Sequence, residues 1–100
     1  MASVKIANGN ELKDGQAKIV QANGQPIALY RVNGKFYASQ NNCLHRSGPL
    51  GEGSLEGETV TCPLHGWQYN VTTGQNVATP TLKLKVYKVE AKGDELFIEV

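Results

Sequence analysis

The amino-acid sequence predicts an all-β protein, a small antiparallel β-sandwich with one insertion of two loops. Short runs in which apolar and polar residues alternate recur along the chain, and this period of two is that of a half-buried strand. Turn signals separate the runs, and no stretch has the apolar period of a helix of useful length. One hundred residues suffice for one domain, so residues 1–100 are expected to form a single domain.

The expected strands follow the alternating runs in order along the chain. They are residues 4–6, 17–22, 26–32, 35–40, 58–61, 67–71, 82–90 and 95–100. The pair Asn33-Gly34 predicts a hairpin, because both central residues of a type I′ turn need positive φ. Residues 82–90 form the longest alternating run and predict the longest strand. Residues 43–57 are expected to be mostly loop, because glycine, proline and serine are frequent there, and residues 76–80 are expected to be loop or extended chain.

Charge and hydropathy exclude several functional classes. The net charge is +1, which does not indicate nucleic-acid binding. Residues 1–50 carry six Lys and Arg against two acids, and residues 51–100 carry four against seven, so the surface is mildly polarised. The N-terminus lacks an apolar signal-peptide segment, and no stretch approaches the roughly 20 apolar residues of a membrane span. We therefore expect a cytoplasmic protein with no nucleic-acid or membrane partner.

Both cysteines and both histidines of the chain lie within one stretch of 23 residues. They form the pairs Cys43-x-His45 and Cys62-x-x-His65, separated by sixteen residues. Each cysteine has a histidine at ligand spacing, which favours metal binding over a disulfide in a reducing compartment. The four side chains are therefore the candidate metal ligands.

Two thiolates and two imidazoles suit either a tetrahedral zinc ion or a [2Fe–2S] cluster. Structural zinc motifs usually pair cysteine with cysteine and histidine with histidine. Here each short motif contains one Cys and one His, an order that suits a binuclear site in which each loop gives one ligand to each iron. The spacing favours the cluster and leaves zinc as the alternative.

The motif and its flanks closely resemble those of Rieske [2Fe–2S] proteins, a family in which two Cys and two His hold the cluster. The likeness extends from the ligands to the sequences Gly48-Pro49-Leu50, Cys62-Pro63 and His65-Gly66-Trp67, and onward to Pro80. The resemblance implies a Rieske-like antiparallel β-sandwich with a two-loop cluster-binding subdomain within residues 43–80. It implies one [2Fe–2S] cluster per chain, bound by Cys43, His45, Cys62 and His65.

Three positions separate the chain from the Rieske proteins of cytochrome bc complexes. That branch carries a disulfide between its two loops, whereas this chain has Gly48 and Leu64 at the corresponding positions. This chain has Trp67 where that branch has a serine that donates a hydrogen bond to a bridging sulfide. Tyr69 matches the tyrosine of that branch that bonds a ligand sulfur. With one donor fewer, the reduction potential is expected near the low end of the Rieske range, roughly −150 mV. The chain is similar to the soluble ferredoxins of multicomponent oxygenases, such as dioxygenases.

The resemblance implies a one-electron carrier and no catalytic site of its own. Both histidines would be ligands, and no dinucleotide-binding glycine motif is present. The expected partners are a reductase and a terminal oxygenase, which would contact a tip formed by His45 and His65. We expect a monomer that meets these partners transiently. Two alternatives remain open, an electron-transfer subunit held permanently in a larger reductase and a zinc-stabilised binding module.

Overall fold

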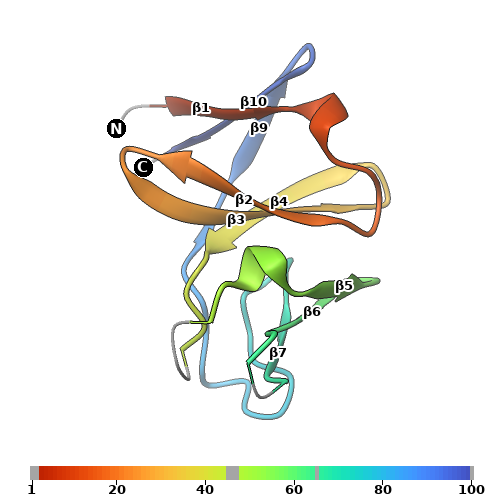
Figure 1. Ribbon diagram of the computed structural model, residues 1–100, viewed down its shortest axis with the longest axis vertical. Coiled ribbons are helices and arrows are strands. Elements are labelled where there is room, and N and C mark those ends of the chain that lie inside the picture. Colours follow the sequence, from red (N-terminus) through yellow and green to blue (C-terminus); the bar gives the residue numbers. More distant parts are fainter. Residues whose placement is uncertain (1–2, 45–47, 65, 100) are drawn as a thin grey trace.

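The computed structural model describes residues 3–44, 48–64 and 66–99, and its strands form three antiparallel layers (Figure 1). The first sheet has the order β1-β10-β9, with bounds Ser3–Asn8, Glu95–Glu99 and Val89–Lys92. The second has the order β2-β3-β4-β8, with bounds Ala17–Ala22, Gln25–Val32, Lys35–Gln40 and Val86–Tyr87. The third has the order β5-β6-β7, with bounds Ser54–Glu56, Thr59–Thr61 and Gln68–Asn70. This architecture confirms the expected all-β sandwich.

Two hairpins build the central sheet, and their turns explain the register. Asn33 and Gly34 have φ of 50° and 79°, so the β3–β4 turn has positive φ at both central positions, as the sequence predicts. Asn23 and Gly24 make the same turn between β2 and β3, with φ of 50° and 78°. The ladders run without interruption from Ala17 opposite Tyr30 to Val32 opposite Lys35.

The central strand β3 is buried on both faces and separates two cores. Alternate side chains enter opposite cores because successive residues of a strand point to opposite faces. The core between the first and second sheets, here called the sandwich core, comprises Ala7, Leu12, Val20, Ala22, Ile27, Leu29, Ala38, Leu96 and Ile98. The core between the second sheet and the third, here called the loop-side core, comprises Ala28, Tyr30, Val32, Cys43, Leu50, Val60, Cys62, Tyr69, Val71 and Leu84.

Helical structure within the described ranges is limited to two 3₁₀ turns, η1 (Gly9–Glu11) and η2 (Leu50–Glu52). No described helix has the length and apolar character needed to cross a membrane. η2 follows the first candidate ligand loop and lies against β2, where an added Cβ on Gly51 would overlap Ile19 Cγ1. Only glycine allows this close approach, which fixes the base of the loop against the central sheet.

The expected strand at residues 82–90 is wrong in its first half. Only β8 and β9 form there, and residues 82–85 make one isolated bridge, between Gln75 and Lys83. This segment instead wraps around the turn after β7, where Leu84 donates to the Gly74 carbonyl at 2.8 Å and buries its side chain. The strand β5 was not expected, because it lies between Gly53 and Gly57 in a segment that the sequence predicts as loop.

Candidate metal centre

The two cysteines begin two loops that are closed in the same way. Cys43 donates its backbone N–H to the Gly48 carbonyl at 3.0 Å, and Cys62 donates to the Trp67 carbonyl at 2.7 Å. In each loop the bond joins a cysteine to the residue five positions later. The first loop follows β4 and leads into η2, and the second connects β6 to β7. The fold thus supports each predicted cysteine ligand at the start of a closed loop.

The first loop is anchored at its base by side-chain and backbone bonds. Asn42 and Pro49 form an isolated antiparallel bridge, and the Asn41 carbonyl accepts the Leu50 N–H at 2.8 Å. The Asn41 side chain is buried, and its Oδ1 accepts the Gly51 N–H at 2.9 Å. Sequence reasoning missed Asn41, and only its position just before the first ligand pair could have drawn attention to it.

The two loops interlock around the cysteine sulfurs. A Cβ built on Gly48 of the first loop would lie 2.6 Å from Cys62 Sγ of the second, and 3.3 Å from the Leu64 side chain. The chain has Gly48 at a position where the cytochrome bc branch has a disulfide cysteine. The structure gives a steric reason for this glycine, because the backbone of residue 48 occupies the space beside the Cys62 sulfur. The two cysteines form no disulfide with each other, and Cys43 and Cys62 are 3% and 2% exposed.

Hydrogen-bond donors surround these sulfurs. The Tyr69 hydroxyl lies 3.3 Å from Cys43 Sγ and accepts the Leu44 N–H at 3.3 Å. Tyr69 therefore contacts the sulfur of Cys43, one of the predicted ligands, as the sequence led us to expect. Burial raises the pKa of the Cys62 thiol, the Leu64 backbone N–H opposes that rise, and Cys43 adds to it. Burial, followed by the Cys43 contact, raises the pKa of Tyr69 to about 12, so its hydroxyl keeps its proton at neutral pH.

The other half of the expected ligand set, His45 and His65, lies outside the described residues, as does Arg46. In the described part of the chain no group of three or more His, Cys, Asp and Glu side chains forms a metal site. What the described residues provide fits an iron–sulfur cluster. Two buried thiols from interlocked loops can act as thiolates on one metal, and hydroxyl and amide donors face them, as ligand sulfurs require.

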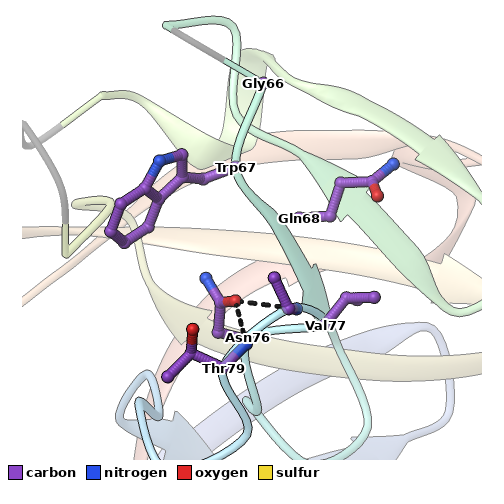
Figure 2. Close-up of a pocket in the computed structure, with 7 residues that line it drawn as sticks. Gly66, Trp67, Gln68, Asn76, Val77 and Thr79 are labelled. Carbon is purple, nitrogen blue, oxygen red and sulfur yellow. Dashed lines mark hydrogen bonds between the residues drawn. The ribbon is translucent and has the colours of Figure 1, made fainter.

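The surface beside the loops is partly apolar. Leu44 and Leu64 each remain 43% exposed, and Trp67 packs against the loop-side core, as expected. Glu52, Glu56 and Glu58 are exposed in the part of the chain between the ligand pairs. Next to the second loop a pocket of about 320 Å³ is lined by Gly66, Trp67, Gln68, Asn76, Val77, Ala78 and Thr79 (Figure 2). The segment 76–79, expected only as loop or extended chain, thus lies beside the candidate centre.

Comparison with known proteins agrees with this geometry. The family described as "Rieske [2Fe-2S] domain" matches residues 2–88. The chain is 36% identical to "Ferredoxin CarAc" of Metapseudomonas resinovorans over 97 residues, which cover 95% of this chain and 91% of that protein. It is 35% identical to the ferredoxin component of the naphthalene 1,2-dioxygenase/salicylate 5-hydroxylase systems of Ralstonia sp. over 92 residues, 91% of this chain and 88% of that protein.

A solved structure has the same fold. It is described as a complex of reduced oxygenase and oxidised ferredoxin in carbazole 1,9a-dioxygenase, and the matching chain has a TM-score of 0.87 and 35% identity. The match covers 96% of this chain and 91% of the other. The family assignment implies a [2Fe–2S] cluster and supports the interpretation of the two buried thiols as iron ligands. The chain belongs to the Rieske [2Fe-2S] domain family.

Proposed function

We propose that this protein is a one-electron carrier that passes electrons from a reductase to a terminal oxygenase. It holds one [2Fe–2S] cluster per chain through Cys43, His45, Cys62 and His65. The observation that carries the proposal is the placement of two buried sulfurs at the starts of two interlocked loops. Relatives named as ferredoxin components of oxygenase systems support the same role and indicate no catalytic function of the chain's own.

The two kinds of ligand divide the work of the centre. Cys43 and Cys62 would bind iron as thiolates, and His45 and His65 would bind it through neutral imidazoles. When bound, the cluster accepts and releases one electron. Two thiolates bring an oxidised centre with two ferric ions and two sulfides to a net charge of zero, whereas four thiolates would make it −2. Adding an electron to a neutral centre costs less, so histidine ligation raises the reduction potential.

Proton release accompanies assembly of the centre. The Cys62 thiol is harder to ionise than a free thiol because it is buried, and a thiolate is the form that binds metal. The positive charge of iron must therefore offset this cost, and cluster binding becomes weaker as the pH falls. The Tyr69 hydroxyl and the Leu64 N–H assist, because both place partial positive charge beside a sulfur.

The half-exposed side chains of Leu44 and Leu64 supply an apolar surface next to the histidine-bearing positions. We propose that the reductase and the oxygenase contact this surface in turn. A carrier that exchanges partners needs a small transient interface, below about 1,200 Å². We further propose that residues 1–100 act as a single Rieske domain, as a monomer, in the cytoplasm, a reducing compartment that favours metal binding by cysteine over disulfide formation.

The experiment is purification under anaerobic conditions, followed by metal and sulfide analysis, EPR of the reduced state and reconstituted electron transfer. The proposal predicts a red-brown protein with two irons and two sulfides per chain. It also predicts reduction by a reductase and reoxidation by a terminal Rieske oxygenase of a dioxygenase system. A colourless protein with stoichiometric zinc would support the zinc module instead. Stable co-purification with a large subunit would support the permanent subunit.

A further inference from the structure

Three asparagines of the chain are each followed by glycine, at Asn8-Gly9, Asn23-Gly24 and Asn33-Gly34. This pair is prone to spontaneous deamidation, because glycine has no side chain to shield its backbone nitrogen. The nitrogen can attack the side-chain carbonyl carbon of the asparagine before it. The proposed electron transfer uses none of these pairs, so any reaction at them is a property of the chain beyond its role as a carrier.

The turns at Asn23-Gly24 and Asn33-Gly34 have the same backbone conformation. Their φ values are 50° and 78° in the first turn and 50° and 79° in the second. All four residues are exposed, and a Cβ built on either glycine would meet nothing within 4 Å. The two turns lie at opposite ends of the central sheet (Figure 1). Conformation and exposure therefore predict equal reactivity, and only further contacts can distinguish the turns.

Hydrogen bonds to the glycine nitrogen differ among the three pairs. The Gly34 N–H donates to Asp14 Oδ1 at 2.8 Å, and the Gly9 N–H donates to the Asp94 carbonyl at 2.6 Å. Among the described residues, the Gly24 N–H has no acceptor. A bonded nitrogen must first break its hydrogen bond before it can attack. The Asp14 carboxylate adds a second obstacle, because its negative charge disfavours loss of the Gly34 proton.

The segment between η1 and β2 protects the β3–β4 turn, because it lies beside the end of that hairpin. Gly15 donates its N–H to the Arg31 carbonyl at 2.8 Å, and the Arg31 N–H donates to the Gln16 carbonyl at 3.1 Å. The Asp14 carboxylate is held in place by Arg31 Nε, which lies 3.0 Å from its Oδ1. In the described part of the chain no segment makes such bonds to the β2–β3 turn.

We propose that Asn23 is a site of spontaneous deamidation, whereas Asn8 and Asn33 are protected by the hydrogen bonds of their glycines. The Gly24 nitrogen loses its proton to a base in solution and attacks Cγ of Asn23. The new N–Cγ bond closes a cyclic imide, the Cγ–Nδ2 bond breaks, and Nδ2 takes up a proton and leaves as ammonia. Water then opens the imide at either carbonyl carbon and gives aspartate or isoaspartate, without oxidation or reduction.

The modification adds negative charge and can also lengthen the main chain. Asn23 lies in the short loop that joins Ala22 to Gln25, which pair with each other in the ladder of β2 and β3. Isoaspartate inserts an extra carbon into this loop, which then no longer matches the register. Ala22 is 1% exposed in the sandwich core, so that end of the core should loosen. Both cysteines belong to the other core, and the centre should keep its potential.

The test is anaerobic incubation of the intact protein at mildly alkaline pH, with peptide mass spectrometry of samples taken over time. A deamidated peptide gains the mass difference between an amide and an acid, and chromatography separates aspartate from isoaspartate. We expect Asn23 to react about tenfold faster than Asn8 or Asn33, because a hydrogen bond to the glycine nitrogen shifts local opening by about that factor. In concentrated urea, where these bonds are lost, the three sites should react at similar rates.

Asp14→Ala tests the cause of the difference. It removes the acceptor of the Gly34 N–H, so Asn33 should react about tenfold faster than in the wild type, with no change at Asn23. Asp14→Asn keeps a side-chain oxygen as acceptor and should protect Asn33 in part. Equal rates at Asn23 and Asn33 in the folded wild type would overturn the inference, as would a rate at Asn33 that Asp14→Ala leaves unchanged.

An equal rise at both sites in Asp14→Ala would also overturn the inference, because it would mean that global unfolding governs the reaction. If Asp14→Ala does not fold, the comparison of sites in the wild type and in Asp14→Asn decides. Ion exchange separates the deamidated protein by its extra charge. Urea unfolding of that fraction should show lower stability at an unchanged reduction potential. The site rates need no cluster, so iron and sulfide analysis tests the proposed function independently.

Discussion

Strand β3 separates two cores that differ in chemistry. The sandwich core contains only aliphatic side chains, whereas the loop-side core contains the thiols of Cys43 and Cys62 and the hydroxyls of Tyr30 and Tyr69. An aliphatic core is complete once its side chains are packed, because burial itself stabilises it. The loop-side core buries polar atoms whose favourable interactions depend on one another and on the metal. The fold thus attaches a core that depends on its cofactor to one that does not.

Loss of the cluster should expose this difference most strongly. We expect His65→Ala to lose the cluster and to raise hydrogen exchange across residues 43–80, while β1–β4, β9 and β10 stay protected. The loops are held by few regular backbone bonds, so the metal contributes much of their stability. Leu64→Ala is the matched control, since Leu64 is half-exposed in the same loop and should retain the cluster. Uniform loss of protection in both cores would contradict the distinction.

Two substitutions that each create a cavity, one in each core, test whether the cores differ in function as well as in chemistry. Leu50 in the loop-side core and Leu96 in the sandwich core are 0% and 1% exposed. We expect Leu50→Ala and Leu96→Ala each to lower the free energy of unfolding by about 2–5 kcal/mol, measured by urea titration. Only Leu50→Ala should also speed cluster loss to a chelator, because it loosens the base of the first loop. Equal rates of cluster loss would show that the two cores act as one unit.

Gly48→Ala tests the close approach of the two loops. The added methyl would meet Cys62 Sγ at 2.6 Å, so one loop must shift and the sulfur must move with it. We expect lower cluster occupancy, measured as iron per chain. The control is Gly57→Ala, whose Cβ would meet nothing within 4 Å although its φ is +59°. That backbone strain costs roughly 1–2 kcal/mol but leaves the sulfurs in place. Full occupancy in Gly48→Ala would remove the steric explanation for glycine at this position.

The features that sequence reasoning could predict are those that depend on residues close together in the sequence. The hairpin between β3 and β4 followed from Asn33-Gly34, whose conformation depends on residues adjacent in sequence. The two cysteines could be proposed as ligands for the same reason, because the spacing of the motif is local. Leu82–Lys85 was placed in a strand because its alternation is real, yet contact with the turn at Gly74 decided its path. Asn41 was missed because its buried side chain acts through a hydrogen bond from the Gly51 N–H, ten residues away, which no local pattern records.

The smallest loss of stability that we expect at neutral pH comes from removal of the buried hydroxyl of Tyr30. It lies 2.9 Å from Ser39 Oγ, and burial raises its pKa well above the ordinary value of about 10, although the Ser39 contact opposes this. A raised pKa means that the neutral phenol stabilises the fold fully below pH 10, and that this contribution falls as the pH rises above 10. We expect Tyr30→Phe to cost about 1 kcal/mol at pH 7 through the lost hydrogen bond.

At alkaline pH the wild type should become less stable than the Tyr30→Phe variant. Phenylalanine cannot ionise, so the stability gap between Tyr30→Phe and the wild type should narrow as the pH is raised above 10 and then reverse. Urea unfolding at pH 7 and at pH 11 measures the gap. Ser39→Ala is the control, because it removes the same hydrogen bond but keeps the phenol and should remain less stable than the wild type at both pH values. Since none of the described side chains of the sandwich core ionises, Leu96→Ala should show the same loss at both pH values. A pH-independent gap for Tyr30→Phe would mean that this phenol does not make the loop-side core sensitive to alkali.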